Sequence, residues 1–233
     1  MTDLSGARVL VLGATGGLGA PICRQLAELG AQLWLSGRDA GRLATLAEGL
    51  GEASVLGTTP ADLSQPGEAE RVVATATDAA GPLGGVVFAA GVVAFGDVVD
   101  LDDDTLDDLL LINLIAPIRV LRAAAPRLAP GGFVVQISAV VAERPMAGMA
   151  AYSASKAGLA AFGAAAATEL RRRKIRVIDV RPPHTETGLA EHPIAGAAPK
   201  LPTGLDADEV AARIVRAVVD DERVLAADAF GPA

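Results

Sequence analysis

The 233-residue sequence predicts a three-layer α/β/α protein in which helices cover both faces of a doubly wound parallel sheet. Short apolar runs alternate along the chain with longer segments of helical pattern, which is typical of repeated strand–helix–strand units. The apolar runs are continuous rather than alternating, as expected for strands that are buried on both faces. A glycine-rich segment joins the first apolar run to the first helical segment. These three observations together predict the fold class.

The elements follow one another without an internal repeat or a low-complexity linker, so residues 1–233 are expected to form one domain. The predicted strands are residues 8–12, 32–36, 54–56, 85–89, 133–138, 176–181 and 223–226. The predicted helices are residues 17–29, 40–50, 66–80, 103–128, 150–172 and 207–219. Asp206 and Glu209 form a start signal for the last helix. Ligands of such sheets bind at the carboxyl ends of the strands, where functional residues are therefore sought.

Composition excludes several classes of protein. Hydrophobic residues make up 51% of the chain and aromatics only 3%, which predicts a core of small aliphatic side chains rather than disorder. The single cysteine, Cys23, excludes an internal disulfide and is consistent with a reducing cytoplasm. We expect no signal peptide and no membrane span, since the longest charge-free apolar runs are residues 85–96 and 157–168. A net charge of −8 argues against nucleic acid as the main ligand.

The glycine-rich segment has the features of a phosphate-binding turn. It comprises Gly13, Thr15, Gly16, Gly17, Leu18 and Gly19. Glycines allow positive φ and a close approach of a ligand to the backbone, and the following helix offers free N–H groups at its start. An ordinary tight turn between a strand and a helix is the alternative. The position directly after the first strand favours a dinucleotide.

The end of the second predicted strand distinguishes the two nicotinamide cofactors. An acidic residue there would hold the ribose 2′-hydroxyl of NAD, whereas an arginine suits the 2′-phosphate of NADP. The chain has Gly37 followed by Arg38, and Arg42 can add a second positive charge. We therefore predict NADP, with NADPH preferred over NADH. The alternative is that Arg38 is a solvated residue at the start of a helix.

Two further segments are candidates for the cofactor site. Asp62, with Leu63 beside it, follows the third strand and is placed to accept a hydrogen bond from the adenine amino group. Ala89, Ala90 and Gly91 follow the fourth strand, where small residues let a cofactor pass close to the backbone. Asp and Gly are also common in ordinary loops.

The candidate chemical groups lie near the middle of the chain. Tyr152, the only tyrosine, lies four residues before Lys156, so both share one helical face. A nearby ammonium lowers the pKa of a phenol by roughly one to three units, although an exposed Tyr–Lys pair is the alternative. Ser138 ends the fifth strand, where its hydroxyl and the phenol could hold one substrate oxygen. Asn113 interrupts an apolar helix and must find hydrogen bonds, whether for catalysis or only for structure.

Together these residues resemble the short-chain dehydrogenase/reductase family in its compact, Rossmann-like single-domain form, over almost all of the chain from Gly13 to Thr187. The resemblance implies that Tyr152 is the general acid/base, that Lys156 holds the nicotinamide ribose, and that Ser138 orients the substrate oxygen. It also implies that Asn113 holds a water of a proton relay. Pro182 and Thr187 would lie against the nicotinamide. The implied enzyme interconverts a carbonyl and an alcohol.

The chain departs from the family pattern at three places: Leu12 replaces a threonine, Phe88-Ala89 replaces Asn-Asn, and Pro183 replaces a glycine. None of these belongs to the proton-transfer set, but all three bear on cofactor affinity and loop motion. Substrate identity is expected to reside in residues 92–100, 139–149 and 184–205, the last being a substrate loop. Candidates for contact with substrate are His184, Arg144, Met146 and Met149.

Other functions stay open at this stage. A protein of this fold can bind NADP as a sensor without turnover, or it can carry out epimerisation or dehydration with the cofactor retained. The resemblance implies a homodimer or homotetramer, for which the helices at 103–128 and 150–172 offer apolar faces. Plain packing of these helices on the sheet is equally consistent with the sequence. No metal site and no nucleic-acid or membrane partner is expected.

Overall fold

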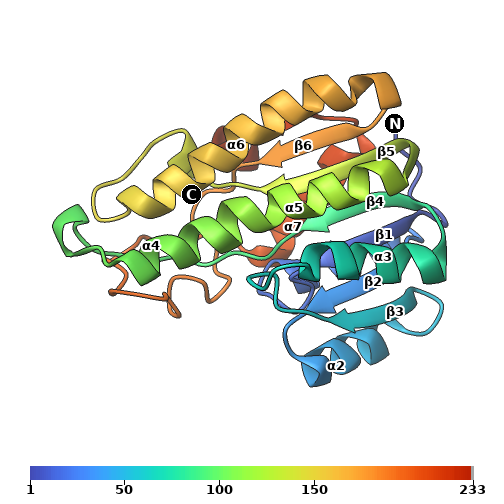
Figure 1. Cartoon of the computed structure of the whole chain (residues 1–233), viewed down its shortest axis with the longest axis horizontal. Coiled ribbons are helices and arrows are strands. Elements are labelled where there is room, and N and C mark those ends of the chain that lie inside the picture. The colour runs from blue at the N-terminus through green and yellow to red at the C-terminus, as the bar shows by residue number, and fades with distance from the viewer. Residues whose placement is uncertain (232–233) are drawn as a thin grey trace.

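The computed structural model describes residues 1–231 and shows one seven-stranded parallel sheet with helices on both faces (Figure 1). The strand order is β3-β2-β1-β4-β5-β6-β7. The strands are β1 Arg8–Leu12, β2 Gln32–Gly37, β3 Val55–Pro60, β4 Leu83–Phe88, β5 Leu128–Ile137, β6 Arg176–Val180 and β7 Val224–Leu225. The helices are α1 Gly19–Glu28, α2 Ala40–Leu50, α3 Glu68–Ala80, α4 Asp103–Leu110, α5 Ala116–Ala124, α6 Ala150–Leu170 and α7 Ala207–Val219. The predicted doubly wound, three-layer fold is confirmed.

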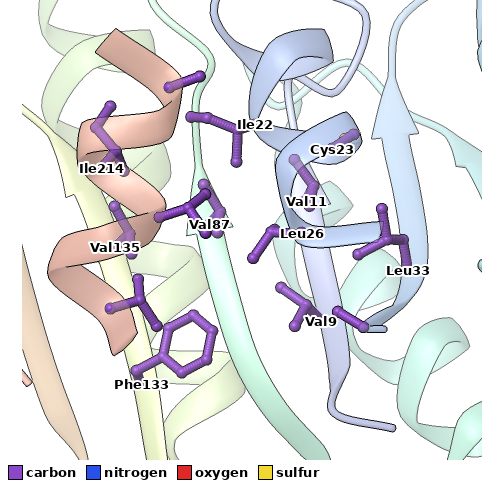
Figure 2. Packing of buried hydrophobic residues seen from close by; sticks show 14 of the residues in the cluster. Val9, Val11, Ile22, Cys23, Leu26, Leu33, Val87, Phe133, Val135 and Ile214 are labelled. Carbon is purple, nitrogen blue, oxygen red and sulfur yellow. The ribbon is translucent and has the colours of Figure 1, made fainter. Parts of the chain in front are cut away.

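Two apolar layers hold the helices to the sheet. On one face α1 and α7 bury aliphatic side chains against β1, β4 and β5; Ile22 and Leu26 of α1 lie beside Val9 and Val11, and Ile214 of α7 lies near Val135 (Figure 2). On the other face α3, α5 and α6 form a second layer. Figure 1 shows α5 and α6 crossing in front of the sheet with α7 behind it. Burial on both faces explains why the strands lack an alternating pattern.

All strand arrows point the same way, so the loops that follow the strands gather at one edge of the sheet (Figure 1). The strand order reverses between β1 and β4. From β1 the sheet continues through β2 and β3 to one side, and from β4 it continues through β5, β6 and β7 to the other. A crevice outside the carboxyl ends at such a reversal is the usual ligand position in this architecture. The fold therefore brings the candidate residues after β1, β2, β4, β5 and β6 to one edge.

The helix predicted at 103–128 is divided. Its middle, Leu111–Ile115, is a π-helical turn, labelled η2, and Asn113 lies at the centre of that turn. Single π-helical turns inside α-helices are common at functional sites. The 25-residue stretch from Asp103 to Arg127 is long and apolar enough to cross a membrane by length and composition alone, contrary to our expectation that no segment is. In the structure α5 packs on α3 and the sheet, as a core helix does.

Other element boundaries differ from the prediction by a few residues. The third strand continues through Gly57 and Pro60, which weaken a strand pattern in the sequence. Proline is tolerated there because β3 is the edge strand. The predicted cap of the last helix by Asp206 is confirmed, since its carboxylate accepts hydrogen bonds from the backbone N–H groups of Asp208 and Glu209.

Candidate active site

The glycine-rich turn after β1 is shaped by close contact between backbone segments. Gly13 has φ of +77°, and a Cβ added to it would lie 2.5 Å from the Ala90 nitrogen. No larger residue fits between the ends of β1 and β4. The helix α1 that follows has no side-chain cap; Ala20 donates its N–H to the Gly16 carbonyl oxygen and Pro21 has no N–H, so Gly19 offers the N–H of this helix start that has no partner within residues 1–231. Gly17 touches Thr187, since a Cβ there would lie 2.1 Å from the Thr187 carbonyl oxygen. The structure thus brings the predicted glycine turn into contact with Ala90 and Thr187.

The end of β2 presents a guanidinium group. Arg38 is exposed and forms no ion pair within residues 1–231. The neighbouring Asp39 is used as a helix cap, because its side chain accepts from the backbone N–H of Arg42. Arg42 itself donates to the Thr15 carbonyl oxygen at 2.6 Å and so braces the glycine turn. Arg38 is therefore the cation that remains for an anionic ligand at this strand end.

The segments after β3 and β4 lie at the same edge. Asp62 accepts hydrogen bonds from the side chain and the backbone N–H of Ser64, which hold the pKa of its carboxyl below the usual range. The side chain of Leu63 is buried in the core. Gly91 lies between two candidate catalytic groups, since a Cβ there would be 3.3 Å from Asn113 Oδ1 and 3.5 Å from Lys156 Nζ.

Asn113 is almost fully hydrogen-bonded. Its Oδ1 accepts from the Val92 N–H at 3.0 Å, and its Nδ2 donates to the Val92 carbonyl oxygen at 2.9 Å and to Ser155 Oγ at 3.2 Å. Ser155 Oγ in turn donates to the Tyr152 carbonyl oxygen. These bonds tie η2 to the segment after β4 and to α6. Sequence reasoning missed Ser155, although its place between Tyr152 and Lys156 could have drawn attention to it.

Tyr152 and Lys156 lie on one face of α6 as predicted, and both are buried. Lys156 Nζ is 5.8 Å from the centre of the Tyr152 ring and donates to the Ile137 carbonyl oxygen at 2.9 Å. Burial lowers the pKa of Lys156 to about 8, against an opposing effect of the Asp179 carboxylate. Burial also raises the pKa of Tyr152. The expected lowering of the phenol pKa by the ammonium is thus wrong here, because removal from water dominates.

Ser138 is not hydrogen-bonded to Tyr152 in the described part of the chain. Its Oγ lies 2.8 Å from Asp179 Oδ1 and 3.1 Å from the Val180 carbonyl oxygen, and a hydroxyl has one proton to donate. The next residue, Ala139, is the one that shares an apolar cluster with Tyr152, together with residues such as Phe95 and Leu109. Ser138 continues the pairing of β5 with β6 through its N–H bond to the Val180 carbonyl oxygen, and the backbone of Ala139 is extended, so successive side chains point to opposite sides. The expected meeting of the Ser138 hydroxyl and the phenol at one substrate oxygen does not match these contacts.

A cavity of about 310 Å³ opens beside Tyr152. Apolar groups form most of its wall, including Phe95, Leu109 and Met149, and Asp97, Asp100 and Asp102 lie on its rim. Among residues 1–231, no lysine, arginine or histidine lines it. Met149 therefore lines the cavity as proposed from the sequence, whereas Arg144, Met146 and His184 do not.

The predicted substrate loop at 184–205 contributes one wall of this cavity. Ile194 donates its N–H to the Val93 carbonyl oxygen at 2.8 Å, and Phe95 donates to the Ala195 carbonyl oxygen at 3.0 Å. Ala195 and Gly196 line the cavity. His184 lies 3.6 Å from Glu186 instead of facing Tyr152's cavity. Pro182 accepts from the Val140 N–H, so the start of the loop is fastened to the segment after β5.

The fold and the site define a nucleotide-dependent oxidoreductase, and comparison with known proteins identifies the family. The sequence profile described as short chain dehydrogenase matches residues 7–195. An oxidoreductase of Methylorubrum extorquens, itself uncharacterized, is 31% identical over 96% of this chain and 94% of that protein. This chain belongs to the short-chain dehydrogenase family, whose members act on alcohols and carbonyls.

Solved structures agree with this assignment. A short chain dehydrogenase of Burkholderia cenocepacia, solved in complex with NADP, has a TM-score of 0.86 and 32% identity, covering 98% of each chain. A short-chain dehydrogenase of Sphingobium yanoikuyae in complex with NADPH has a TM-score of 0.85 and 30% identity, covering 94% of this chain and 87% of that one. The likeness extends over the whole sheet and both helical layers.

Proposed function

We propose that this chain is an NADPH-dependent reductase of an apolar carbonyl compound, with Tyr152 as the proton donor. The observation that carries the proposal is the position of Tyr152, which forms part of the wall of the 310 Å³ cavity while Lys156 lies on the same helical face. The same pair interconverts alcohol and carbonyl in either direction. The raised pKa of Tyr152 favours the protonated phenol, which is the form that reduction requires.

The residues at the sheet edge fit a nicotinamide dinucleotide. Gly13 lies close to Ala90, and no side chain caps the start of α1, so a pyrophosphate could approach the backbone there. Arg38 would take the 2′-phosphate, since Asp39 is occupied as a cap. Asp62 with Leu63 would face the adenine, Ala89 to Gly91 would line the path, and Pro182 and Thr187 would lie beside the nicotinamide. The two similar solved structures with NADP or NADPH support this assignment.

The candidate catalytic groups have different parts in this reaction. When bound, NADPH would supply the hydride that a carbonyl carbon accepts. Tyr152 gives its phenolic proton to the carbonyl oxygen, so that an alcohol and NADP⁺ result, and the phenol regains a proton from solvent. The charged ammonium of Lys156 stabilises the phenolate that forms in this step. Asn113 braces the edge through Val92 and Ser155, and its role as holder of a relay water stays a prediction. We assign Ser138 no contact with substrate, because its hydroxyl faces Asp179.

The lining of the cavity favours a substrate without negative charge. Asp97 and Asp100 are exposed at the rim and form no ion pair within residues 1–231, whereas both oxygens of Asp102 accept from Thr105. Within residues 1–231, no lysine, arginine or histidine lines the cavity to neutralise a carboxylate or a phosphate. We therefore place a ketone or aldehyde with an apolar body, neutral or cationic, in this cavity.

Titration with NADPH and NADH separately, followed by Trp34 fluorescence, tests the cofactor assignment first. NADPH is expected to bind more tightly than NADH. NADPH consumption is then measured with three matched ketones that differ only in a neutral, ammonium or carboxylate end. A higher kcat/KM for the neutral and cationic ketones than for the anionic one supports the proposal, and preferred turnover of the anionic ketone contradicts the substrate class.

The same measurements separate the alternative functions. Binding of NADPH without turnover of any carbonyl would favour a sensor, and cofactor that stays bound without net oxidation would favour an epimerase or dehydratase. A homodimer or homotetramer and a cytoplasmic location stay predictions; mass measurement in solution checks the first.

A further inference from the structure

A buried carboxylate behind the active site has no part in the mechanism above. Asp179 lies on β6, within the apolar run Val177-Ile178-Asp179-Val180, and is 4% exposed. A buried carboxylate is costly unless it is paired and hydrogen-bonded. Two neutral donors and one cation surround it in this structure, so the site is built around its charge.

Three side chains donate to this carboxylate. Ser138 Oγ and Gln136 Nε2 lie 2.8 Å and 3.2 Å from Asp179 Oδ1, and Arg181 Nε lies 2.7 Å from Oδ2. Arg181 also reaches Glu143 at 3.1 Å, in the segment that follows β5. The carboxylate therefore connects β5, β6 and the loop that leads to the cavity.

The two donors from β5 flank the residue that holds Lys156. Gln136 and Ser138 stand on either side of Ile137, and the Ile137 carbonyl oxygen accepts from Lys156 Nζ at 2.9 Å. In the sheet, Gln136 is opposite Asp179 and Ile137 is opposite Val180. Gln136 and Ser138 thus connect the carboxylate to the strand end whose carbonyl oxygen accepts from the ammonium.

Helix α6 is fixed to the same point. Gln136 Nε2 also donates to the Leu159 carbonyl oxygen of α6 at 2.9 Å. Space for this contact exists only because residue 163 is glycine, since a Cβ there would lie 2.1 Å from Gln136 Nε2. The helix that carries Tyr152 and Lys156 is thus tied to Asp179 through one amide group.

We infer that Asp179 is a positioning residue: it holds the end of β5, and with it the Ile137 carbonyl, against Lys156. This inference rests on the proposed roles of Tyr152 and Lys156. The negative charge of Asp179 has a second effect, because it favours the ammonium form of Lys156. It therefore opposes the burial that lowers the pKa of Lys156 to about 8. The charged or titratable groups around this pair are Tyr152 on α6, Arg181 after β6 and Glu143 after β5.

The direct test is the protonation of Lys156 in Asp179→Asn, which keeps the size of the side chain and removes its charge. NMR of ¹⁵N,¹³C-labelled lysine resolves this without turnover, because the sequence contains only Lys156, Lys174 and Lys200, and the latter two are exposed internal controls. The pKa of Lys156 is expected to fall by about one unit, while those of the controls stay unchanged.

Turnover gives the second measurement. With a pKa lowered by about one unit from 8, the loss of reduction rate in Asp179→Asn is about fivefold larger at pH 8 than at pH 6, because Lys156 stays charged at pH 6. Glu143→Gln is the matched control, because it removes the ion pair between Arg181 and Glu143 and is expected to leave the Lys156 titration as in the wild type. Equal loss at both pH values, with an unchanged Lys156 titration and a lower Tm, would show a merely structural role and overturn the inference.

A further variant covers the case in which Asp179→Asn does not fold. Arg181→Gln leaves the carboxylate without its cation and is expected to raise the pKa of Lys156, the opposite direction. An unchanged Lys156 titration in this variant would also overturn the inference. Failure of the proposed function is distinct from either result, because it would show as absence of NADPH oxidation by the wild type with every carbonyl offered.

Discussion

The nucleotide side and the chemical side of this sheet edge are constructed in opposite ways. At β1 and β2 the site consists of backbone and one exposed cation: a glycine turn pressed against Ala90, an uncapped helix start and Arg38. At β5 and β6 it consists of buried side chains that satisfy one another, from Asp179 through Gln136 and Ser138 to the carbonyl that holds Lys156. The first side therefore depends on the absence of side chains at its glycines, whereas the second depends on hydrogen bonds between buried side chains.

The comparison is tested most strongly at Tyr152. Tyr152→Phe removes only the phenolic hydroxyl, and turnover is expected to fall by about 10² to 10⁴-fold, the range for loss of a general acid. The dissociation constant of NADPH, measured by fluorescence titration, should change little. Turnover within a factor of two of the wild type would exclude Tyr152 as the proton donor.

The glycine turn is expected to respond to the smallest added side chain. Gly13→Ala forces a Cβ to within 2.5 Å of the Ala90 nitrogen at a positive φ, so stability and NADPH binding both fall. Gly51→Ala is the matched control, since Gly51 has φ of +82° with nothing within 4 Å. The control should lose only about 1 to 3 kcal/mol in urea unfolding, the cost of a side chain in this strained backbone region. Equal losses in both variants would mean that the contact with Ala90 is unimportant.

Arg38 is the side chain on which the nucleotide side depends. Arg38→Gln removes a charge-assisted contact worth roughly 1.5 to 3 kcal/mol, so the dissociation constant of NADPH should rise about 10- to 100-fold. That of NADH should stay nearly constant, because NADH has no 2′-phosphate. Parallel titrations check this, and an equal effect on both cofactors would remove Arg38 from the phosphate site.

The pH dependence of reduction reports on the chemical side. The pKa of Lys156 is lowered to about 8, so the ammonium is present below that pH and is lost above it. The raised pKa of Tyr152 keeps the phenol protonated across this range. We therefore expect kcat/KM for reduction to be level near pH 6 to 7 and to fall as pH rises through about 8. A rate that rises through pH 8 would contradict this assignment.

The smallest effect is expected at the cavity rim. Asp97→Asn combined with Asp100→Asn should raise kcat/KM for the carboxylate ketone about two- to fivefold in dilute buffer, because exposed charges interact weakly in water. At about 1 M salt the difference should vanish. Asp107→Asn with Asp108→Asn, on exposed positions of α4 that do not line the cavity, should have no effect.

This contrast explains which features could be predicted from the sequence. The glycine turn, Arg38 and the Tyr152–Lys156 pair are local patterns, in which spacing along the chain fixes spacing in space. The fold class follows from periodicity for the same reason. The division of the helix at Asn113 was not predicted, because a π-helical turn has no simple sequence signal and depends on the contacts of Asn113 with Val92 and Ser155.

The partner of Ser138 was not predictable in the same way. Ser138 and Asp179 are 41 residues apart, and only the pairing of β5 with β6 makes them neighbours. The available signal was Asp179 itself, an acidic residue inside an apolar strand with Arg181 two positions later. The raised pKa of Tyr152 likewise depends on burial by distant segments, which local spacing does not reveal.

The backbone hydrogen bonds between residues 93–95 and 194–195 bear on how the substrate preference of this enzyme could change. They fix the path of the cavity wall through N–H and carbonyl groups, which every residue except proline supplies. Side chains on the 184–205 loop can therefore be exchanged while the wall keeps its course, except at Gly196, where an added Cβ would lie 1.8 Å from the Phe95 carbonyl oxygen. Selection for a new substrate can act on this loop without rebuilding the proton donor.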